Sequence, residues 1–262
     1  MRGVLVGALL VVLVAAAGWV TIGKAAGPSV ARVSAGPTGG DGPSIAIVKG
    51  TPTVGSSRRP GALRGAARVA KLFKRIPQRG LVLGRANAPV MLIEYVDLQC
   101  PICQEFEAAD MRTLVRKFVR PGKLRIEIQP WNIIDRNVGS HDSLRGQEAT
   151  IAAARQNKAF QFAEVLYDHQ GTEGSHWLND GMVSKIAASV DGLRPYKLAA
   201  DANSAATRKV IKSIARWGNS HPTQMTGTPT LYLVRRRGRP KYFGTGIPPL
   251  AELEAAINAL LK

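Results

Sequence analysis

Residues 94–106 read EYVDLQCPICQEF and contain the chain's only two cysteines, Cys100 and Cys103. The apolar run 90-VMLIEYV-96 predicts a buried strand, and 101-PICQEFEAADMRTLVRKFVR-120 has the pattern of an amphipathic helix. Cys100 then lies at the start of this helix, and Cys103 lies one turn inside it. Unpaired N–H groups and a partial positive charge at a helix start favour a thiolate over a thiol. Because the thiolate is the nucleophile in disulfide exchange, this stretch predicts a thiol–disulfide exchange site.

The composition limits what else the cysteines could do. Two cysteines cannot build a structural disulfide framework, and a structural zinc site needs four ligands. The four histidines show no ligand spacing relative to the cysteines, so we expect no metal site and no cofactor. At 45% apolar residues, the 262-residue chain has the composition of an ordinary globular protein.

The N-terminal third carries the membrane and charge signals. Residues 3–23 contain no charged side chain, and a transmembrane helix needs about 20 residues. We favour a membrane anchor over a cleaved signal peptide, because the apolar run continues beyond the small residues 15-AAA-17. The net charge is +18, and residues 1–79 hold twelve Lys or Arg but one acid, Asp41. Since either reading of residues 3–23 exports the chain, we expect no nucleic-acid partner.

Three segments follow from these patterns. Residues 1–24 are the anchor or signal peptide, and residues 25–62, rich in Gly, Pro, Ser and Thr, predict a flexible linker. Residues 63–76 fit either a membrane-surface helix or the opening helix of the folded domain. A narrow, alanine-rich apolar face favours the second interpretation, and at helical spacing that face comprises Leu63, Ala67, Ala70 and Phe73.

The remaining pattern predicts an α/β thioredoxin fold in residues 63–262. Strands are expected within 80–90 and at 90–96, 123–129, 229–234 and 241–243. Helices are expected at 101–120, near 141–156, 158–169, 180–190 and 195–217, and at 249–262. The four middle helices form an insertion, at about 140–217, between the two halves of the fold.

Residues from about 65 to 262 resemble the DsbA-like thiol–disulfide oxidoreductases, in particular the membrane-tethered bacterial branch similar to BdbD. Four stretches carry the resemblance: 76-IPQRGLVLGRANAPV-90, 94-EYVDLQCPICQEF-106, 158-KAFQFAEVLYDHQ-170 and 227-GTPTLYLV-234. A lone CxxC is weak evidence, because metal carriers and zinc sites also use it. A Gly-Thr-Pro-Thr that enters a strand about 125 residues later makes the resemblance much more specific.

The resemblance implies catalytic roles for Cys100, Cys103, Glu94 and Pro229. Cys100 would be the exposed, nucleophilic sulfur of the redox-active disulfide, and Cys103 the more buried resolving sulfur. Glu94, six residues before Cys100, would exchange a proton with Cys103 through water. The alternative is a half-exposed strand acid in a salt bridge. The Thr228–Pro229 peptide bond would be cis, and Pro229 would lie against the CxxC.

Substrate binding is expected at Thr228, Pro229, Pro101 and Ile102, with the backbone of Thr228 pairing with a bound peptide like an added strand. Strongly oxidising DsbA proteins carry a histidine where Ile102 stands, and this histidine helps to stabilise the thiolate. Ile102 cannot donate a hydrogen bond. We therefore expect a less extreme oxidant, in which the pKa of Cys100 is lowered but stays at about 7 or above.

These expectations combine into an extracytoplasmic, monomeric enzyme that forms or exchanges disulfides. Its partners would be exported unfolded or thiol-containing proteins, and a membrane protein related in role to DsbB or vitamin K epoxide reductase would reoxidise it. Three alternatives stay open: a reductase, for example in cytochrome c maturation, a non-catalytic CxxC metal carrier, and a peptide-binding protein.

Overall fold

A computed structural model describes residues 42–262, and the predicted anchor lies outside them. In this part of the chain, six strands form one sheet in the order β1-β2-β4-β3-β5-β6. Strand β3 pairs in parallel with β4 and antiparallel with β5, so it is central, as its apolar run predicts. The strands are β1 (Gln78–Arg79), β2 (Val82–Leu83), β3 (Val90–Val96), β4 (Leu124–Pro130), β5 (Thr230–Arg235) and β6 (Lys241–Thr245).

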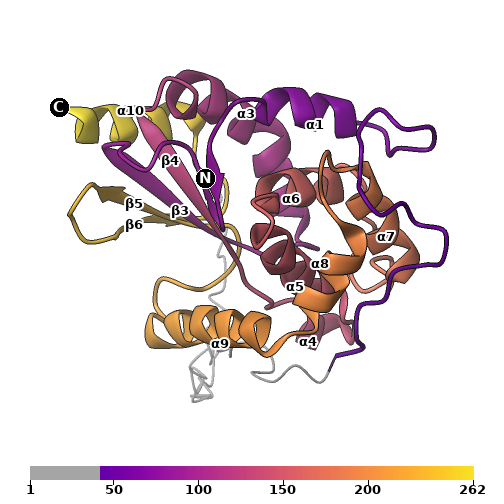
Figure 1. Cartoon of the computed structure of the whole chain (residues 1–262). Helices are drawn as coiled ribbons and strands as arrows, with labels where there is room; N and C mark the ends of the chain where they lie inside the picture. Colours follow the sequence, from indigo (N-terminus) through magenta and orange to yellow (C-terminus); the bar gives the residue numbers. More distant parts are fainter. Residues whose placement is uncertain (1–41) are drawn as a thin grey trace, which may run out of the picture. The chain divides into compact units, whose positions relative to one another are not determined.

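Helices cover both sides of the sheet, and a helical block extends beyond it (Figure 1). The helices are α1 (Ala66–Phe73), α2 (Pro101–Phe106), α3 (Arg112–Leu114), α4 (Asp135–Val138), α5 (Asp142–Ala154), α6 (Ala159–Tyr167), α7 (Asp180–Ser189), α8 (Pro195–Ala202), α9 (Ala205–Ser220) and α10 (Leu250–Leu261). The predicted thioredoxin fold with a helical insertion is confirmed. Among residues 42–262, every helix is too short or too polar to cross a bilayer.

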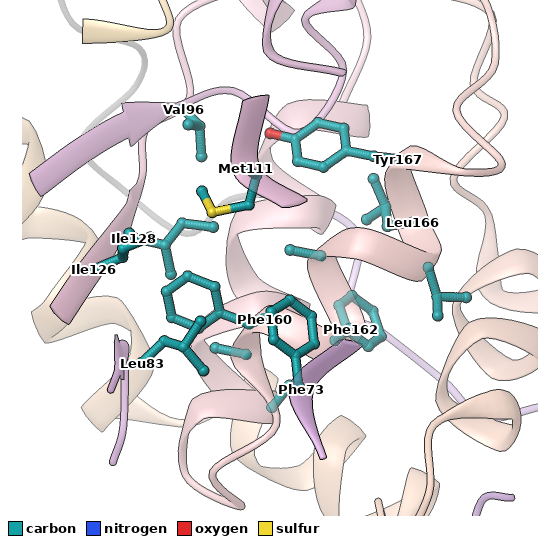
Figure 2. Close-up of a cluster of buried hydrophobic side chains, with 14 of the residues drawn as sticks. Phe73, Leu83, Val96, Met111, Ile126, Ile128, Phe160, Phe162, Leu166 and Tyr167 are labelled. Atoms are coloured by element: carbon teal, nitrogen blue, oxygen red, sulfur yellow. The ribbon is translucent and has the colours of Figure 1, made fainter. Parts of the chain in front are cut away.

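Alternation along β3 divides the core into two parts. Leu92 and Val96 belong to a large cluster that includes the helical run after the cysteines, helix α6 and α10. Figure 2 shows Val96, Met111 and Phe160 in this cluster. Ile93 and Tyr95, on the opposite face of β3, pack in a second cluster with residues of α5 and α9. Side chains at even positions of β3 therefore face the helix that carries the CxxC.

The predicted helix at 101–120 forms as one continuous run with two wider turns. Two π-helical stretches belong to the run. The first, η1 (Glu107–Met111), lies between α2 and α3, and the second, η2 (Val115–Val119), follows α3. The N–H of Arg120 donates to the carbonyl oxygen of Val115 at 2.9 Å, which is the i to i−5 bond of a π turn. The run ends at 121-PG-122, where Gly122 adopts a positive φ of 85°.

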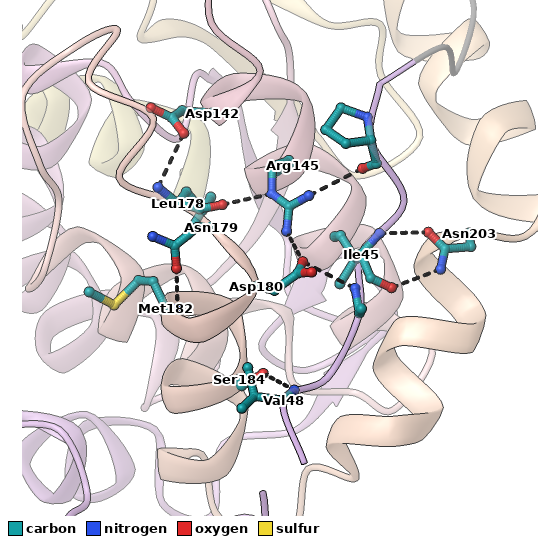
Figure 3. A network of polar contacts seen from close by, with 12 residues as sticks. Ile45, Val48, Asp142, Arg145, Leu178, Asn179, Asp180, Met182, Ser184 and Asn203 are labelled. Carbon is teal, nitrogen blue, oxygen red and sulfur yellow. Dashed lines mark hydrogen bonds and ion pairs between the residues drawn. The ribbon is translucent and has the colours of Figure 1, made fainter.

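The prediction of a flexible linker at 25–62 is wrong for residues 43–62, which lie in the described part of the chain. Figure 3 shows residues 45–48 tied to the helical block by backbone hydrogen bonds to side chains. Ile45 is 2% exposed and exchanges two hydrogen bonds with the Asn203 amide, at 3.0 and 2.9 Å. Val48 N–H donates to Ser184 Oγ at 3.0 Å. The composition suggested disorder, but long-range polar contacts satisfy this backbone without any strand or helix.

Two helix predictions also need correction. The opening helix exists, but Ala67 is exposed, and the buried side of α1 consists of Ala66, Val69, Leu72 and Phe73. The single helix expected at 195–217 is two helices, α8 and α9. It breaks because the Ser204 hydroxyl accepts from Thr207 N–H at 3.2 Å and so caps α9.

Candidate active site

Cys100 lies at the junction that the sequence predicts, between β3 and α2. It is the N-cap of α2, with an extended backbone (φ −74°, ψ 120°), and Pro101 occupies the first helical turn. Its N–H donates to the Asp97 carbonyl oxygen at 3.1 Å, and its carbonyl oxygen accepts from Gln104 N–H at 3.1 Å. Cys103 follows one turn inside the helix and is completely buried. Both cysteines are free thiols.

Thr228 and Pro229 meet the cysteines from the start of β5. The Thr228–Pro229 bond is cis, as predicted. The Cys100 thiol donates to the Thr228 carbonyl oxygen, with an Sγ···O distance of 3.4 Å. Cys100 is only 6% exposed, so the prediction of an exposed sulfur is wrong.

The two thiols have pKa values shifted in opposite directions. A hydrogen bond from the Cys103 side chain lowers the pKa of Cys100 to about 6 against the effect of burial. The Thr228 side chain and the N–H groups of Cys103 and Ile102 add to the lowering. Burial raises the pKa of Cys103 well above its ordinary value. A pKa of about 6 is lower than we expected from Ile102. The side chains of Cys103 and Thr228 and the backbone N–H groups of Ile102 and Cys103 stabilise the thiolate, in place of a side chain between the sulfurs.

The helical block braces the loop that carries Cys100. The Tyr167 hydroxyl, at the end of α6, donates to the Asp97 carbonyl oxygen at 3.2 Å. The Gln170 amide donates to the carbonyl oxygens of Leu98 and Cys100, at 3.0 and 3.3 Å. In return, the Gln104 amide of α2 donates to the Tyr167 carbonyl oxygen at 2.6 Å. These bonds fix the loop and α2 to one element of the insertion.

Asp97 and Gln99, two buried residues of the same loop, bind residues 133–143 on the other side of it. Asp97 Oδ2 accepts from the N–H groups of Ile133 and Ile134, at 2.9 and 3.1 Å. The Gln99 amide donates to Asp135 Oδ1 at 2.7 Å and to Ser143 Oγ at 2.6 Å. Burial raises the pKa of Asp97 to about 7, although hydrogen bonds from Ser143 and three backbone N–H groups oppose the shift.

Three buried carboxyl groups lie on the side of the sheet that faces the cysteine helix. Glu94 of β3 is completely buried, and neither of its carboxyl oxygens has a hydrogen-bond partner within residues 42–262. Burial, and then the charge of Glu164, raise the pKa of Glu94 well above its ordinary value. Glu107, hydrogen-bonded to Glu164, is shifted upward for the same reason, and Glu164 itself is raised to about 7. The alternative of a half-exposed Glu94 in a salt bridge is therefore wrong.

The structure brings most of the predicted site residues together. Cys100, Cys103, Thr228 and Pro229 meet at one point, while Ile102 projects outward and is 45% exposed. Glu94 makes no direct hydrogen bond to a cysteine among the described residues. No group of three His, Cys, Asp or Glu side chains in residues 42–262 is placed to hold a metal ion.

Sequence reasoning missed the residues that support the site. Tyr167 and Gln170 belong to the stretch 158–170, where we assigned no site role to any residue. Glu107 and Glu164 are acids within predicted amphipathic helices, where an acid normally faces solvent. A usable signal was available for Glu107: it lies four positions after Cys103 and four before Met111, so helical spacing places it on the same buried face as these two residues.

Comparison with known proteins agrees with this geometry. A family model described as Thioredoxin matches residues 77–239, more than half of the chain. The chain is 24% identical over 117 residues to the disulfide bond formation protein D of Bacillus subtilis. The aligned region covers 45% of this chain and 51% of that protein. Thus the chain spans about half the length of the curated relatives it matches.

Solved structures show the same fold. The crystal structure of oxidised BdbD from Bacillus subtilis has a TM-score of 0.57 at 18% identity, covering 71% of this chain and 97% of that one. The crystal structure of DsbA from Chlamydia trachomatis has a TM-score of 0.56 at 19% identity, covering 71% of this chain and 92% of that one. At these identities, the likeness concerns the fold.

The hydrogen bond between the cysteines gives a testable pKa. We expect the ultraviolet absorbance of the Cys100 thiolate to titrate with a pKa of about 6 in the reduced protein. The Cys103→Ala variant should titrate with a higher pKa, because it loses the hydrogen bond that lowers the pKa most. A lowered pKa stabilises the folded reduced protein above the unfolded thiol's pKa of about 8.5, and this contribution is lost as the pH falls through about 6. An unchanged or lower pKa in Cys103→Ala would contradict the assignment.

Proposed function

Because the chain belongs to the thioredoxin family, we propose that it is a thiol–disulfide oxidoreductase that uses Cys100 and Cys103 as its redox pair. One observation carries the proposal: Cys100 is the N-cap of α2, with a pKa lowered to about 6, while the pKa of its partner thiol is raised. A metal carrier would need both sulfurs in an exposed loop, whereas Cys103 is completely buried. The relatives named for disulfide bond formation support the same activity.

In the proposed oxidation, a substrate thiolate attacks Cys100 Sγ of the Cys100–Cys103 disulfide. This forms a mixed disulfide with Cys100, and Cys103 leaves as a thiolate that takes up a proton. A second substrate thiolate then attacks the substrate sulfur of the mixed disulfide and releases Cys100 as a thiolate. The substrate gains a disulfide and the enzyme gains two electrons. The low pKa makes Cys100 a good leaving group in this last step.

Glu94 is proposed to exchange the Cys103 proton. It lies on the face of β3 that is directed toward the cysteine helix, and burial raises the pKa of its carboxyl well above the ordinary value. A raised pKa matches a group that accepts and returns a proton near neutral pH. Since the carboxyl makes no hydrogen bond to a cysteine within the described residues, an intervening water would carry the proton.

The peptide-binding surface is proposed at the exposed edge of the site. Pro101 and Ile102 are exposed beside Cys100, and Thr228 is half-buried above Pro229. An extended peptide could pair with the backbone at Thr228 while an apolar side chain contacts Ile102. We further propose that the domain works outside the cytoplasm on exported proteins, reoxidised by a membrane partner, since disulfides persist in oxidising compartments. The uncharged residues 3–23 support this location.

Trapping of the mixed disulfide tests the proposed function. The Cys103→Ala variant keeps the nucleophile but lacks the resolving thiol. We expect its Cys100 to accumulate a disulfide-linked adduct when it is mixed with an oxidised peptide. The matched Cys100→Ala variant should form none, because the remaining thiol is completely buried and has a raised pKa. Equal adduct formation by both variants, or by neither, would contradict the proposal.

The role of Glu94 predicts a kinetic effect with its own pH dependence. Glu94→Gln should slow oxidative refolding of a reduced substrate by about ten-fold or more, with a flatter pH profile near neutrality. Glu105→Gln is the control, because it removes an exposed acid from α2. If Glu94→Gln and Glu105→Gln have the wild-type rate and pH profile, Glu94 does not transfer the proton.

A further inference from the structure

A basic pocket lies between α1 and the helical run that follows the cysteines. Figure 1 shows α1 beside α3, which is part of that run. Its volume is about 350 Å³. Its lining, which defines the basic pocket here, is Arg68, Lys71, Leu72, Arg112, Arg116 and Arg120. Five of these six residues are cationic and none is acidic. A second hollow, lined by Lys71, Lys74, Arg75 and Arg120, continues the same positive surface.

Four of the five cations in the basic pocket form no ion pair within residues 42–262, although the charges of Arg68 and Arg112 oppose the rise in the pKa of the buried Glu164. Within residues 42–262, Arg68 is the member of the basic pocket that forms an ion pair, with Asp168. Arg120 donates to the main-chain oxygens of Leu72 and Lys74, at 2.6 and 3.2 Å, and these bonds leave its charge intact. Like charges held this close repel one another, so the folded domain keeps them together at a cost.

Two guanidinium nitrogens in the basic pocket also lack acceptors. Arg68 Nη1 and Arg112 Nε are buried, and neither has a hydrogen-bond partner among the described residues. A buried donor without an acceptor costs free energy, most of all when it belongs to a charged group. A ligand that brings negative charge and several acceptor oxygens would remove both costs.

The apolar side of α1 is not available for a membrane. Val69, Leu72 and Phe73 are buried, and the Phe73 ring lies 6.1 Å from the Phe160 ring of α6, in an edge-to-face contact. The helix therefore cannot lay an apolar face into a bilayer, as the membrane-surface interpretation required. The outward side of α1 carries its cationic side chains, which can bind an anion through charge and hydrogen bonds.

We propose that the basic pocket binds a phosphate group, carried either by a soluble phosphate or by a lipid headgroup. The planar forks of Arg112 and Arg116 match phosphate oxygens in pairs, and the Lys71 ammonium adds a mobile point charge. None of the lining residues belongs to the candidate active site. The inference therefore stands apart from the proposed function, and each can fail without the other.

Two matched double variants of the full chain test the site. The pocket variant is Lys71→Gln with Arg116→Gln, both exposed and without an ion pair in the described part of the chain. The control is Lys212→Gln with Arg216→Gln, which removes one exposed Lys and one exposed Arg from α9. Both variants should keep the wild-type thiol titration, because the four side chains are exposed and lie outside the candidate active site. The control should also keep the wild-type unfolding midpoint, whereas the pocket variant should unfold at the same or a slightly higher midpoint, because it loses repulsion between like charges.

The binding measurements have two arms, at low ionic strength and in a buffer free of phosphate. Calorimetric titration with inorganic phosphate measures the soluble form, and co-sedimentation with phosphatidylglycerol vesicles, against phosphatidylcholine vesicles, measures the lipid form. We expect the pocket variant to bind about ten-fold more weakly or worse, and the control to stay within about two-fold of wild type, because two charge-assisted donors are lost. Residues 1–41 are identical in all three proteins, so differences report the basic pocket.

The pattern of loss identifies the source of the phosphate. A loss confined to the titration identifies a soluble phosphate, a loss confined to phosphatidylglycerol vesicles identifies a lipid headgroup, and a loss in both shows that the site accepts either. Each of these outcomes supports the proposal. It is overturned if the pocket variant and the control are equal in both arms, or if the wild-type protein binds neither probe.

Discussion

The position of Cys100 at the first turn of α2 is the constraint on which the site depends. β3 ends beneath it, Thr228 meets its sulfur from β5, and Tyr167 and Gln170 of the insertion hold the loop that precedes it. Three stretches that are distant in sequence, the β3–α2 junction, residues 167–170 and Thr228, therefore meet at this turn. Such a position is rigid, and rigidity is what lets a few hydrogen bonds keep a thiolate at neutral pH.

Burial and hydrogen bonding shift the pKa values of neighbouring groups in opposite directions. Desolvation raises the pKa values of Cys103 and Glu94, yet Cys100, which is also buried, has a lowered pKa because donors surround its sulfur. The pair therefore holds one ionised sulfur and one protonated sulfur at neutral pH. This asymmetry distinguishes Cys100, the reactive sulfur, from Cys103, the resolving one. Glu94, a buried carboxyl with a raised pKa, lies on the same side of the sheet.

Much of the fold could be predicted because its signals are local. The run at 90–96, the cysteine spacing and the helical periodicity of residues 141–169 each specify an element by neighbouring residues. Residues 43–62 were misjudged because Ile45 is fixed by Asn203, which lies 158 positions away. The burial of Cys100 and the bracing by Gln170 likewise depend on contacts between distant segments, which periodicity does not encode. Resemblance, rather than pattern, identified Thr228 and Pro229.

The redox potential of the Cys100–Cys103 pair tests the central claim most directly. The full chain is equilibrated in glutathione buffers, and the reduced fraction is measured by thiol alkylation. A thiolate with a pKa of about 6 lies between those of thioredoxin, about 7, and DsbA, about 3.5. The account therefore predicts a potential between about −270 and −120 mV. A value at or below that of thioredoxin, or a pair that forms no reversible disulfide, would contradict it.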